Sequence, residues 1–493
     1  MMPALMTTPA CCVRALALCS LLLLAACGGG DEEEGPLRVS VIGPQPQLVI
    51  PARTEPDAPE AALLLAAAQG LVSFDAAGQI ETGLAERWNV SDDGMSYIFR
   101  LRDASWSDGT PVTARQVVAG LRAAVAGGSP NRLAVLFGAI DAIVAVTPQV
   151  IEIRLKAPRP LLLPLLAQPE LGALHRGQGS GPYRIGAIAG GATLLEPLIP
   201  KSPTEAPQVT YPVELRAERA ALALVRFKRG TVAAVLGGSY LDLPVARAAA
   251  MSAVQLRFDP AQGLFGLAVT AGKDGFLSRA DNRNALAMAI DRDAIVALFS
   301  VREWRPMLSI VPMRLDMAGD PALPDWASLN RDLRVALARA RVTAWANDKG
   351  AVPALRIALP AGPGSRLLFA RLSADLAAIG LGAVRVGAKD AADLALIDSV
   401  SPSDSATWYL RRLACANGTP CSPAGDAALV AARDTLSLAE RAARLKEADA
   451  AYMANMPFIP IASPMRWSAV APRLGGFALN ARAVHPLGRL LKD

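Results

Sequence analysis

Residues 83–116 read GLAERWNVSDDGMSYIFRLRDASWSDGTPVTARQ, and the rest of the chain is organised around this stretch. Its first part is predicted to be a short helix that ends in Trp88. The turn-forming residues 91–94 follow, and Asp-Asp-Gly is typical of such a turn. Apolar and charged residues then alternate, which predicts a strand with one apolar face. That face carries Tyr97, Phe99 and Leu101.

A second turn completes the stretch. Trp106 precedes Asp-Gly-Thr-Pro at 108–111, where glycine supplies a positive φ and proline restricts the next residue. Thr113 is of a type that caps helices, so a helix is predicted to begin near Ala114. By physical reasoning alone, residues 83–116 therefore form a tryptophan-anchored unit of strand, turn and helix.

The order of these pieces resembles one family. The pattern L-A-x-x-W-x-V-S-D-D-G-x-S-Y-x-F-x-L-R, followed by W-S-D-G-T-P-V-T-A, is similar to the signature of the peptide/nickel-type (family 5) solute-binding proteins of ABC importers. Further segments resemble the family at 177–185, 281–292, 456–461 and 473–477. The resemblance implies an α/β, two-lobed periplasmic-binding-protein-like fold (type II, cluster C) with an additional inserted subdomain.

The resemblance also implies domain boundaries. Lobe I is expected to be discontinuous and to comprise 37–50, 177–257 and 456–493. The inserted subdomain is expected at 51–176 and lobe II at 258–455. Strand and helix patterns alternate between residues 355 and 386, which favours a mixed or parallel sheet with helices against it.

The first 26 residues are predicted to be a signal peptide. Arg14 precedes an apolar run that is short for a membrane span and ends in Leu-Ala-Ala before Cys27. This order resembles a lipobox, in which Cys27 carries the lipid. Residues 27–36, rich in glycine and acid, would form a flexible tether. The alternative is an ordinary signal peptide cut near Ala26, with an incidental cysteine. Either way, the sequence predicts export to the periplasm or cell surface, and the lipobox predicts membrane anchoring.

Cysteine and histidine usage limits the chemistry. Outside the signal and Cys27, the remaining cysteines are Cys415 and Cys421, which bracket a turn-forming stretch. In an oxidising compartment a disulfide between them is predicted, with two free thiols as the alternative. The two histidines, His175 and His485, are far apart in sequence, so neither a metal site nor a cofactor is expected.

Length and composition exclude other classes. A chain of 493 residues is too long for one core, so two or three domains are expected. The net charge of +6 is dispersed, without a basic block between aromatics, which argues against nucleic-acid binding. The glycine-rich segment 177–185 lacks the Gly-Lys-Ser/Thr ending of a phosphate-binding loop and the spacing of a dinucleotide fingerprint.

The resemblance implies ligand contacts in a segment similar to W-x-A-D-Y-P-D-P, which here is 397–402. Asp398 matches the first acid, and in peptide binders the matching acid pairs with the α-ammonium of the ligand. The alternative is that Asp398 caps a turn. Trp408 and Tyr409 follow and are candidates to line the pocket, with a plain core role as the alternative for each.

The implied function is capture of a small solute, most readily a peptide, and its delivery to an ABC permease by a monomeric protein. No catalytic constellation is evident, because the chain lacks a G-x-S-x-G elbow, an H-E-x-x-H motif and a His-paired nucleophile. The sequence departs from the family at 198–202, where a pattern R-N-x-x-Y-W is usual. It departs again at 230–233, where both usual acids are missing and Asp242 is the nearest acid that remains. The alternative function is therefore a ligand sensor or a protein-binding lipoprotein with the same fold. A secreted hydrolase with an unrelated fold is a third class.

Overall fold

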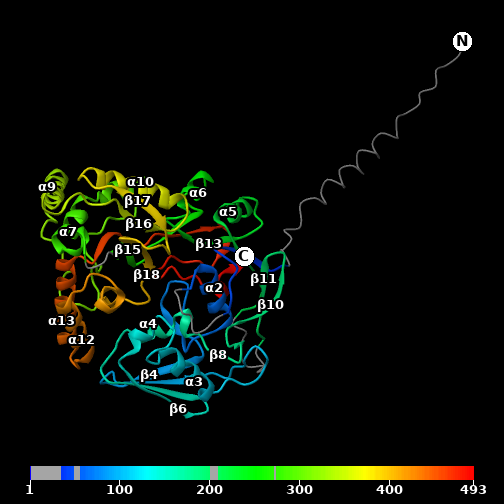
Figure 1. Cartoon of the computed structure of the whole chain (residues 1–493). Coiled ribbons are helices and arrows are strands. Elements are labelled where there is room, and N and C mark those ends of the chain that lie inside the picture. The colour runs from blue at the N-terminus through cyan, green and yellow to red at the C-terminus, as the bar shows by residue number, and fades with distance from the viewer. Residues whose placement is uncertain (2–34, 49–55, 200–208, 271–273, 493) are drawn as a thin grey trace. The chain divides into compact units, whose positions relative to one another are not determined.

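A computed structural model describes residues 1, 35–48, 56–199, 209–270 and 274–492. The helices and strands below all belong to the unit Leu37–Asp493 (Figure 1). The predicted signal peptide, Cys27 and most of the departure at 198–202 lie outside the described residues. None of the described helices has the length and apolar character needed to cross a membrane.

The first sheet has the strand order β10-β11-β12-β1-β13-β20-β14 among the described residues. The strands are β1 (Leu37–Ile42), β10 (Tyr183–Ala189), β11 (Ala192–Pro197), β12 (Val213–Glu218), β13 (Ala234–Ser239), β14 (Leu256–Asp259) and β20 (Arg466–Val470). Strand β1 lies between β12 and β13 and is parallel to both, so Leu37–Ile42 lies inside the sheet and not at its edge. Helices α2 (Ala58–Ala67) and α5 (Ala220–Lys228) pack against β1.

The inserted region has its own antiparallel sheet, with the order β4-β5-β7-β6. Its strands are β4 (Ala85–Val90), β5 (Ser96–Leu101), β6 (Ile140–Thr147) and β7 (Val150–Leu155), and helix α3 (Ala114–Val125) contacts β6 and β7. Tyr97, Phe99 and Leu101 of β5 are buried, whereas Ile98 is exposed, so the predicted alternation is confirmed. Thr113 is the N-cap of α3, also as predicted, and its backbone N–H donates to the side chain of Gln116.

The prediction of a short helix ending in Trp88 is wrong. Residues Ala85–Val90 are strand β4, in which Trp88 lies opposite Phe99 of β5. The segment contains good helix formers, but pairing with β5 satisfies its backbone and places Trp88 against the inserted core. Tertiary pairing therefore overrides local propensity here.

Glycines in 177–185 allow a close backbone approach. A Cβ on Gly179 would lie 1.9 Å from the carbonyl oxygen of Ala67, and one on Gly181 would lie 2.3 Å from that of Ala66. Both carbonyl oxygens belong to the C-terminal end of α2, so side chains at Gly179 and Gly181 would push this segment away from the helix. Tyr183 is buried directly after this approach, as predicted.

The second sheet has the order β17-β16-β18-β15-β19. The strands are β15 (Gly263–Val269), β16 (Leu355–Leu359), β17 (Ala383–Gly387), β18 (Leu394–Val400) and β19 (Phe458–Ala462). Strand β16 is parallel to β17 and β18, which confirms the mixed sheet predicted from the alternation at 355–386. The helices of this region are α7 (Ala280–Ala289), α8 (Arg292–Phe299), α9 (Arg331–Lys349) and α10 (Pro363–Ala377).

Two of the expected lobe boundaries differ from the sheet membership. Strand β14 belongs to the first sheet and ends at Asp259, beyond the expected boundary at 257. Strand β19 pairs with β15 in the second sheet, although 456–493 was expected in lobe I. The chain therefore returns to the first sheet between β19 and β20, not before β19. Which sheet a strand joins depends on distant partners, and its own sequence does not contain that information.

Helices α11 (Ala406–Arg411), α12 (Pro423–Asp434) and α13 (Leu438–Asn455) pack together. The remaining described elements are short: β2 (Val72–Phe74), β3 (Ile80–Thr82), β8 (Leu174–His175), β9 (Gln178–Gly179), β21 (Leu474–Gly475), β22 (Leu491–Lys492), α4 (Leu162–Leu166), α6 (Leu243–Ala248), η1 (Ala134–Phe137), η2 (Pro169–Leu171), η3 (Phe276–Ser278), η4 (Cys415–Asn417) and η5 (Leu487–Arg489). Buried apolar residues of the described chain form several clusters, and one of these clusters lies in the inserted subdomain. More than one core was expected from the length of the chain.

Candidate functional site

A cavity of about 510 Å³ lies between the inserted subdomain and segments that connect strands of the second sheet. One wall comes from 135–140 and 155–165 of the inserted subdomain, and the other from 314–317, 403–411 and 429–442. Its volume falls within the roughly 300–1,000 Å³ typical of small-molecule sites. The lining is mostly apolar side chains interrupted by arginines.

The wall on the inserted subdomain is tied to the opposite wall through Arg159. Its guanidinium donates to the carbonyl oxygens of Pro158 (2.7 Å) and Arg433 (2.6 Å), and Arg433 lies in the last turn of helix α12. Burial, followed by the nearby charge of Arg441, lowers the pKa of Arg159 to about 10. Nearby, Gln168 donates to the carbonyl oxygen of Pro402 at 2.9 Å, which also joins the two walls.

The other wall is organised by Asp316. Its carboxylate accepts from Nη1 of Arg441 (2.6 Å), from the hydroxyl of Ser405 (3.0 Å) and from the backbone N–H of Ala406 (2.7 Å). Arg441 also donates to the hydroxyl of Thr407 at 2.8 Å. These bonds join the loop at 314–317, the start of α11 and the first turns of α13 into one unit.

Helix α11 presents Trp408 and Arg411 to the cavity. Trp408 is buried, with the guanidinium of Arg412 4.7 Å from the centre of its ring. Burial, followed by the charge of Arg433, lowers the pKa of Arg411. Trp408 therefore supplies an apolar surface, and Arg411 a cation in a partly desolvated position.

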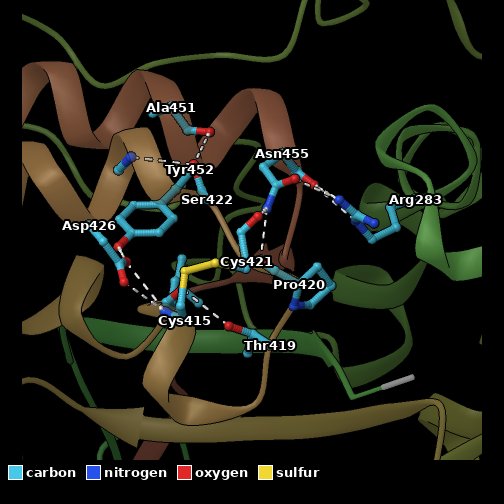
Figure 2. Close-up of a disulfide and its surroundings, with 12 residues drawn as sticks. Arg283, Cys415, Thr419, Pro420, Cys421, Ser422, Asp426, Ala451, Tyr452 and Asn455 are labelled. Carbon is cyan, nitrogen blue, oxygen red and sulfur yellow. Dashed lines mark hydrogen bonds between the residues drawn. A yellow bond between two sulfur atoms is a disulfide. The ribbon is translucent and has the colours of Figure 1, made fainter. Parts of the chain in front are cut away.

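A disulfide loop follows α11 and holds its end in place. Cys415 and Cys421 form a disulfide, and Figure 2 shows how the neighbouring side chains surround it. Asp426 accepts from the backbone N–H of Cys415 and from the hydroxyl of Tyr452. Within the loop, Asn417 donates to the carbonyl oxygen of Arg411 at 2.6 Å. The loop therefore links the last residue of α11 to helices α12 and α13.

Asp398 lies in strand β18, so its interpretation as the cap of a turn is wrong. Its carboxylate forms an ion pair with Arg466 of the first sheet, at 2.8 Å between Oδ1 and Nη1. Both side chains are mostly buried, with 16% and 19% of their surfaces exposed. The ammonium-binding role of Asp398 stays a prediction, and it requires a rearrangement of Arg466.

The other predicted ligand residues fall in different places. Trp408 lines the cavity, whereas Tyr409 is fully buried beside it and is absent from the lining, as is Asp398. Asp242, the nearest acid to the departure at 230–233, precedes α6, and burial raises its pKa. In the described part of the chain, no group of three or more His, Cys, Asp or Glu residues is arranged to hold a metal ion.

Sequence reasoning missed the arginines of the cavity. Arg159, Arg411 and Arg441 lie in no motif, and each is separated from the others in the chain. The sequence did contain one indication: Arg159 directly precedes the apolar run 160–167, which is expected to be buried. Such a signal does not say which other segment will face it.

The fold defines the class of protein. The chain has a mixed α/β fold that matches two-lobed periplasmic binding proteins along almost its whole length. The crystal structure of Haemophilus influenzae OppA in complex with RPPGFSPFR aligns with a TM-score of 0.79 and 16% identity, covering 93% of this chain and 99% of that one. The Escherichia coli murein tripeptide binding protein MppA also aligns with a TM-score of 0.79, at 18% identity, over 93% and 99% of the two chains.

Sequence similarity covers a smaller part. Residues 79–204 match the model of the bacterial extracellular solute-binding proteins, family 5 Middle. The "Probable deoxycholate-binding periplasmic protein YgiS" of Escherichia coli (strain K12) is 36% identical over 121 residues, 21% of this chain and 23% of that protein. The periplasmic oligopeptide-binding protein OppA of Haemophilus influenzae is 40% identical over 77 residues, 15% and 14% of the two chains. These matches span less than a quarter of each relative.

The resemblance seen in the sequence is therefore confirmed. This chain is similar to the family 5 solute-binding proteins of the peptide and nickel type, in sequence over residues 79–204 and in fold over 93% of its length.

Proposed function

We propose that this protein captures a small solute outside the cytoplasm and delivers it to an ABC-type permease. The observation that carries the proposal is the cavity of about 510 Å³ enclosed by distant segments of a binding-protein fold. Its apolar lining with a few placed charges is the composition expected of a small-molecule site. No reaction is proposed, because the relatives that match in sequence are named as binding proteins.

Hinge closure is the proposed mechanism. The chain passes between its two sheets from β14 to β15 and from β19 to β20, through short connections. Such connections can absorb a rotation of one lobe against the other. A solute that contacts both walls would bind the closed state more tightly than the open one, and this difference in affinity would shift the population toward closure. The ion pair of Asp398 with Arg466 joins the two sheets and would add to the closed state.

Two ligand classes have support. A peptide is supported by the oligopeptide-binding relative, and in that case Asp398 would exchange Arg466 for the ammonium group of the ligand. An apolar organic acid is supported by the relative named for deoxycholate binding and by the arginines of the cavity. The alternative function, a sensor or protein-binding lipoprotein, keeps the same site but works without a permease.

Export, anchoring and assembly complete the proposal. The signal peptide would direct export, and lipidation at Cys27 would anchor the protein at a membrane surface, with residues 27–36 as the tether. The protein would act as a monomer. The relatives named above are periplasmic, which supports export.

A ligand screen coupled to transport tests the proposal. The exported protein, made from its full-length gene, would be screened by thermal shift against pools of peptides, sugars, metal chelates and organic acids. A ligand at 100 times its dissociation constant should stabilise the fold by about 2.7 kcal/mol. Uptake of the hit should then fall in cells that lack the gene. Unchanged uptake would favour the sensor alternative, and no hit with well-folded protein would contradict solute capture.

A further inference from the structure

We propose that the cavity takes an amphipathic organic anion, a solute with an apolar body and one carboxylate, whose carboxylate is bound by Arg159 and Arg411. The inference rests on the proposed function, since it names the class of solute for the same site. It follows from three features of the walls: their apolar area, their unbalanced charge, and the way their acids are already engaged.

The apolar body has a ready environment. Both walls contribute aliphatic side chains, and Trp408 adds an aromatic surface. Leu438, at the start of α13, lines the cavity with 47% of its surface exposed, although it is a large apolar residue. Covering such surface with an apolar solute removes it from water and favours binding in proportion to the area covered.

The charge of the lining is strongly one-sided. Five arginines and two aspartates are among the described residues that line the cavity: Arg159, Arg314, Arg411, Arg433, Arg441, Asp316 and Asp404. Both acids are already paired, Asp316 with Arg441 and Asp404 with Arg482. The lining therefore offers cations, and its acids are not available to a positively charged solute.

Two of these cations make no direct ion pair. Within the described residues, Arg159 donates to backbone carbonyl oxygens and forms no ion pair with a carboxylate. The guanidinium of Arg411 makes no hydrogen bond or ion pair in that same part of the chain, although it is half-buried. The charges of Asp316 and Asp434 offset part of the burial of Arg159, and that of Asp426 part of the burial of Arg411, without a direct ion pair. Partly desolvated cations without a direct carboxylate contact are costly, and an entering carboxylate would supply that contact.

Arg159 and Arg411 line the same cavity. Arg159 donates to the carbonyl oxygen of Arg433 in the last turn of α12, and Arg433 also belongs to the lining. Arg433 itself is paired with Asp434. The proposal places the carboxylate of the solute in this cavity beside the end of α12, where both guanidiniums belong to the lining. An ammonium group at the same place would be repelled by them.

The disulfide loop keeps Arg411 in this position. Asn417 holds the carbonyl oxygen of Arg411, and Thr419 holds that of Leu413 at 3.1 Å. Since the loop is closed by Cys415 and Cys421, the end of α11 is fixed before a solute arrives. A preorganised cation loses less conformational entropy when it binds an anion.

Isothermal titration of the exported protein with decanoate tests the inference. Decyltrimethylammonium, which keeps a ten-carbon tail and reverses the charge, and butyrate, which keeps the carboxylate and shortens the tail, are the control compounds. Decanoate is expected to bind at least about tenfold more tightly than either control, since charge-assisted hydrogen bonds and apolar burial both contribute. Equal binding of decanoate and decyltrimethylammonium would overturn the proposal.

Variants locate the carboxylate. Arg411→Gln and Arg159→Gln should each weaken decanoate binding by about tenfold or more. Arg257→Gln, an exposed position on β14, is the matched control and should leave binding unchanged. If either cavity variant unfolds, Arg314→Gln on the exposed loop should still weaken binding several-fold, because it removes a positive charge from the lining. Wild-type affinity in all folded cavity variants would overturn the assignment.

A tripeptide pool measured on the same samples separates the two proposals. Binding of peptides without binding of decanoate would reject the organic anion and leave solute capture standing. Binding of neither, with uptake of the screened pools unaffected by loss of the gene, would reject both.

Discussion

The cluster around Asp316 should be a main source of local stability. Arg441 is buried at 8% exposure, and Asp316 is its only carboxylate partner among the described ion pairs. Substitution of Asp316 by alanine removes this partner and also removes an acceptor from the first backbone N–H of α11. Leaving a buried charge unpaired costs about 3–5 kcal/mol. Loss of a capping hydrogen bond costs about 1 kcal/mol.

The two losses overlap, because one carboxylate makes both contacts, and the Asp316 side chain is 22% exposed. We therefore expect Asp316→Ala to lower the free energy of unfolding by about 3–4 kcal/mol. Adding Arg441→Met removes the orphaned charge, so the double variant should lose about 2 kcal/mol less than the sum of the single losses.

Urea unfolding followed by tryptophan fluorescence measures this cycle. Arg444→Met is the control on the same helix, because Arg444 is exposed at 41% and its pairs with Glu440 and Glu447 are screened by water, so its loss should change stability little. The reasoning is refuted if Asp316→Ala stays within about 1 kcal/mol of the wild type, or if the two single losses simply add in the double variant.

Two further predictions concern α13 and the disulfide loop. Burial raises the pKa of Asp449 to about 6, so the folded state holds this proton more tightly than the unfolded chain, and the resulting stability is present below about pH 4 and lost as the pH rises through 6. Asp449→Asn should therefore be more stable than the wild type at pH 8 by up to about 3 kcal/mol. Urea unfolding of both proteins at pH 4 and pH 8 measures this, and the same difference in free energy of unfolding at both pH values would contradict it. Replacing Cys415 and Cys421 together by alanine should cost about 2 kcal/mol, because the closed loop is short. The wild type unfolded in dithiothreitol should match that variant, and no change on reduction would show that the loop is held by its hydrogen bonds alone.

The strand-turn-helix unit at 83–116 shows how far local sequence reaches. The buried face of β5 and the N-cap at Thr113 were predictable, because alternation and capping depend on neighbours within a few residues. The start of the same unit was not, because β4 contains helix-forming residues and becomes a strand through pairing with β5. The helix prediction fails here because the backbone hydrogen bonds are made with a strand that lies several residues further along the chain.

The candidate site was harder to predict from the sequence than the fold. Trp408 was singled out from the sequence and does line the cavity, whereas Asp398 is paired with Arg466, 68 residues away along the chain. The resemblance indicated which residue was acidic, but it could not indicate that this chain places a cation of its own beside it.

By itself, then, the sequence determined the family resemblance, the alternating strands, the helix caps and the two cysteines available to pair, since each is written in consecutive residues. Only the tertiary structure decided that β19 joins the second sheet, and that Arg159 and Arg411 share one apolar cavity. These outcomes depend on packing between segments hundreds of residues apart. The burial of apolar surface determines which segments pack together, and the positions of the charged side chains result from that packing.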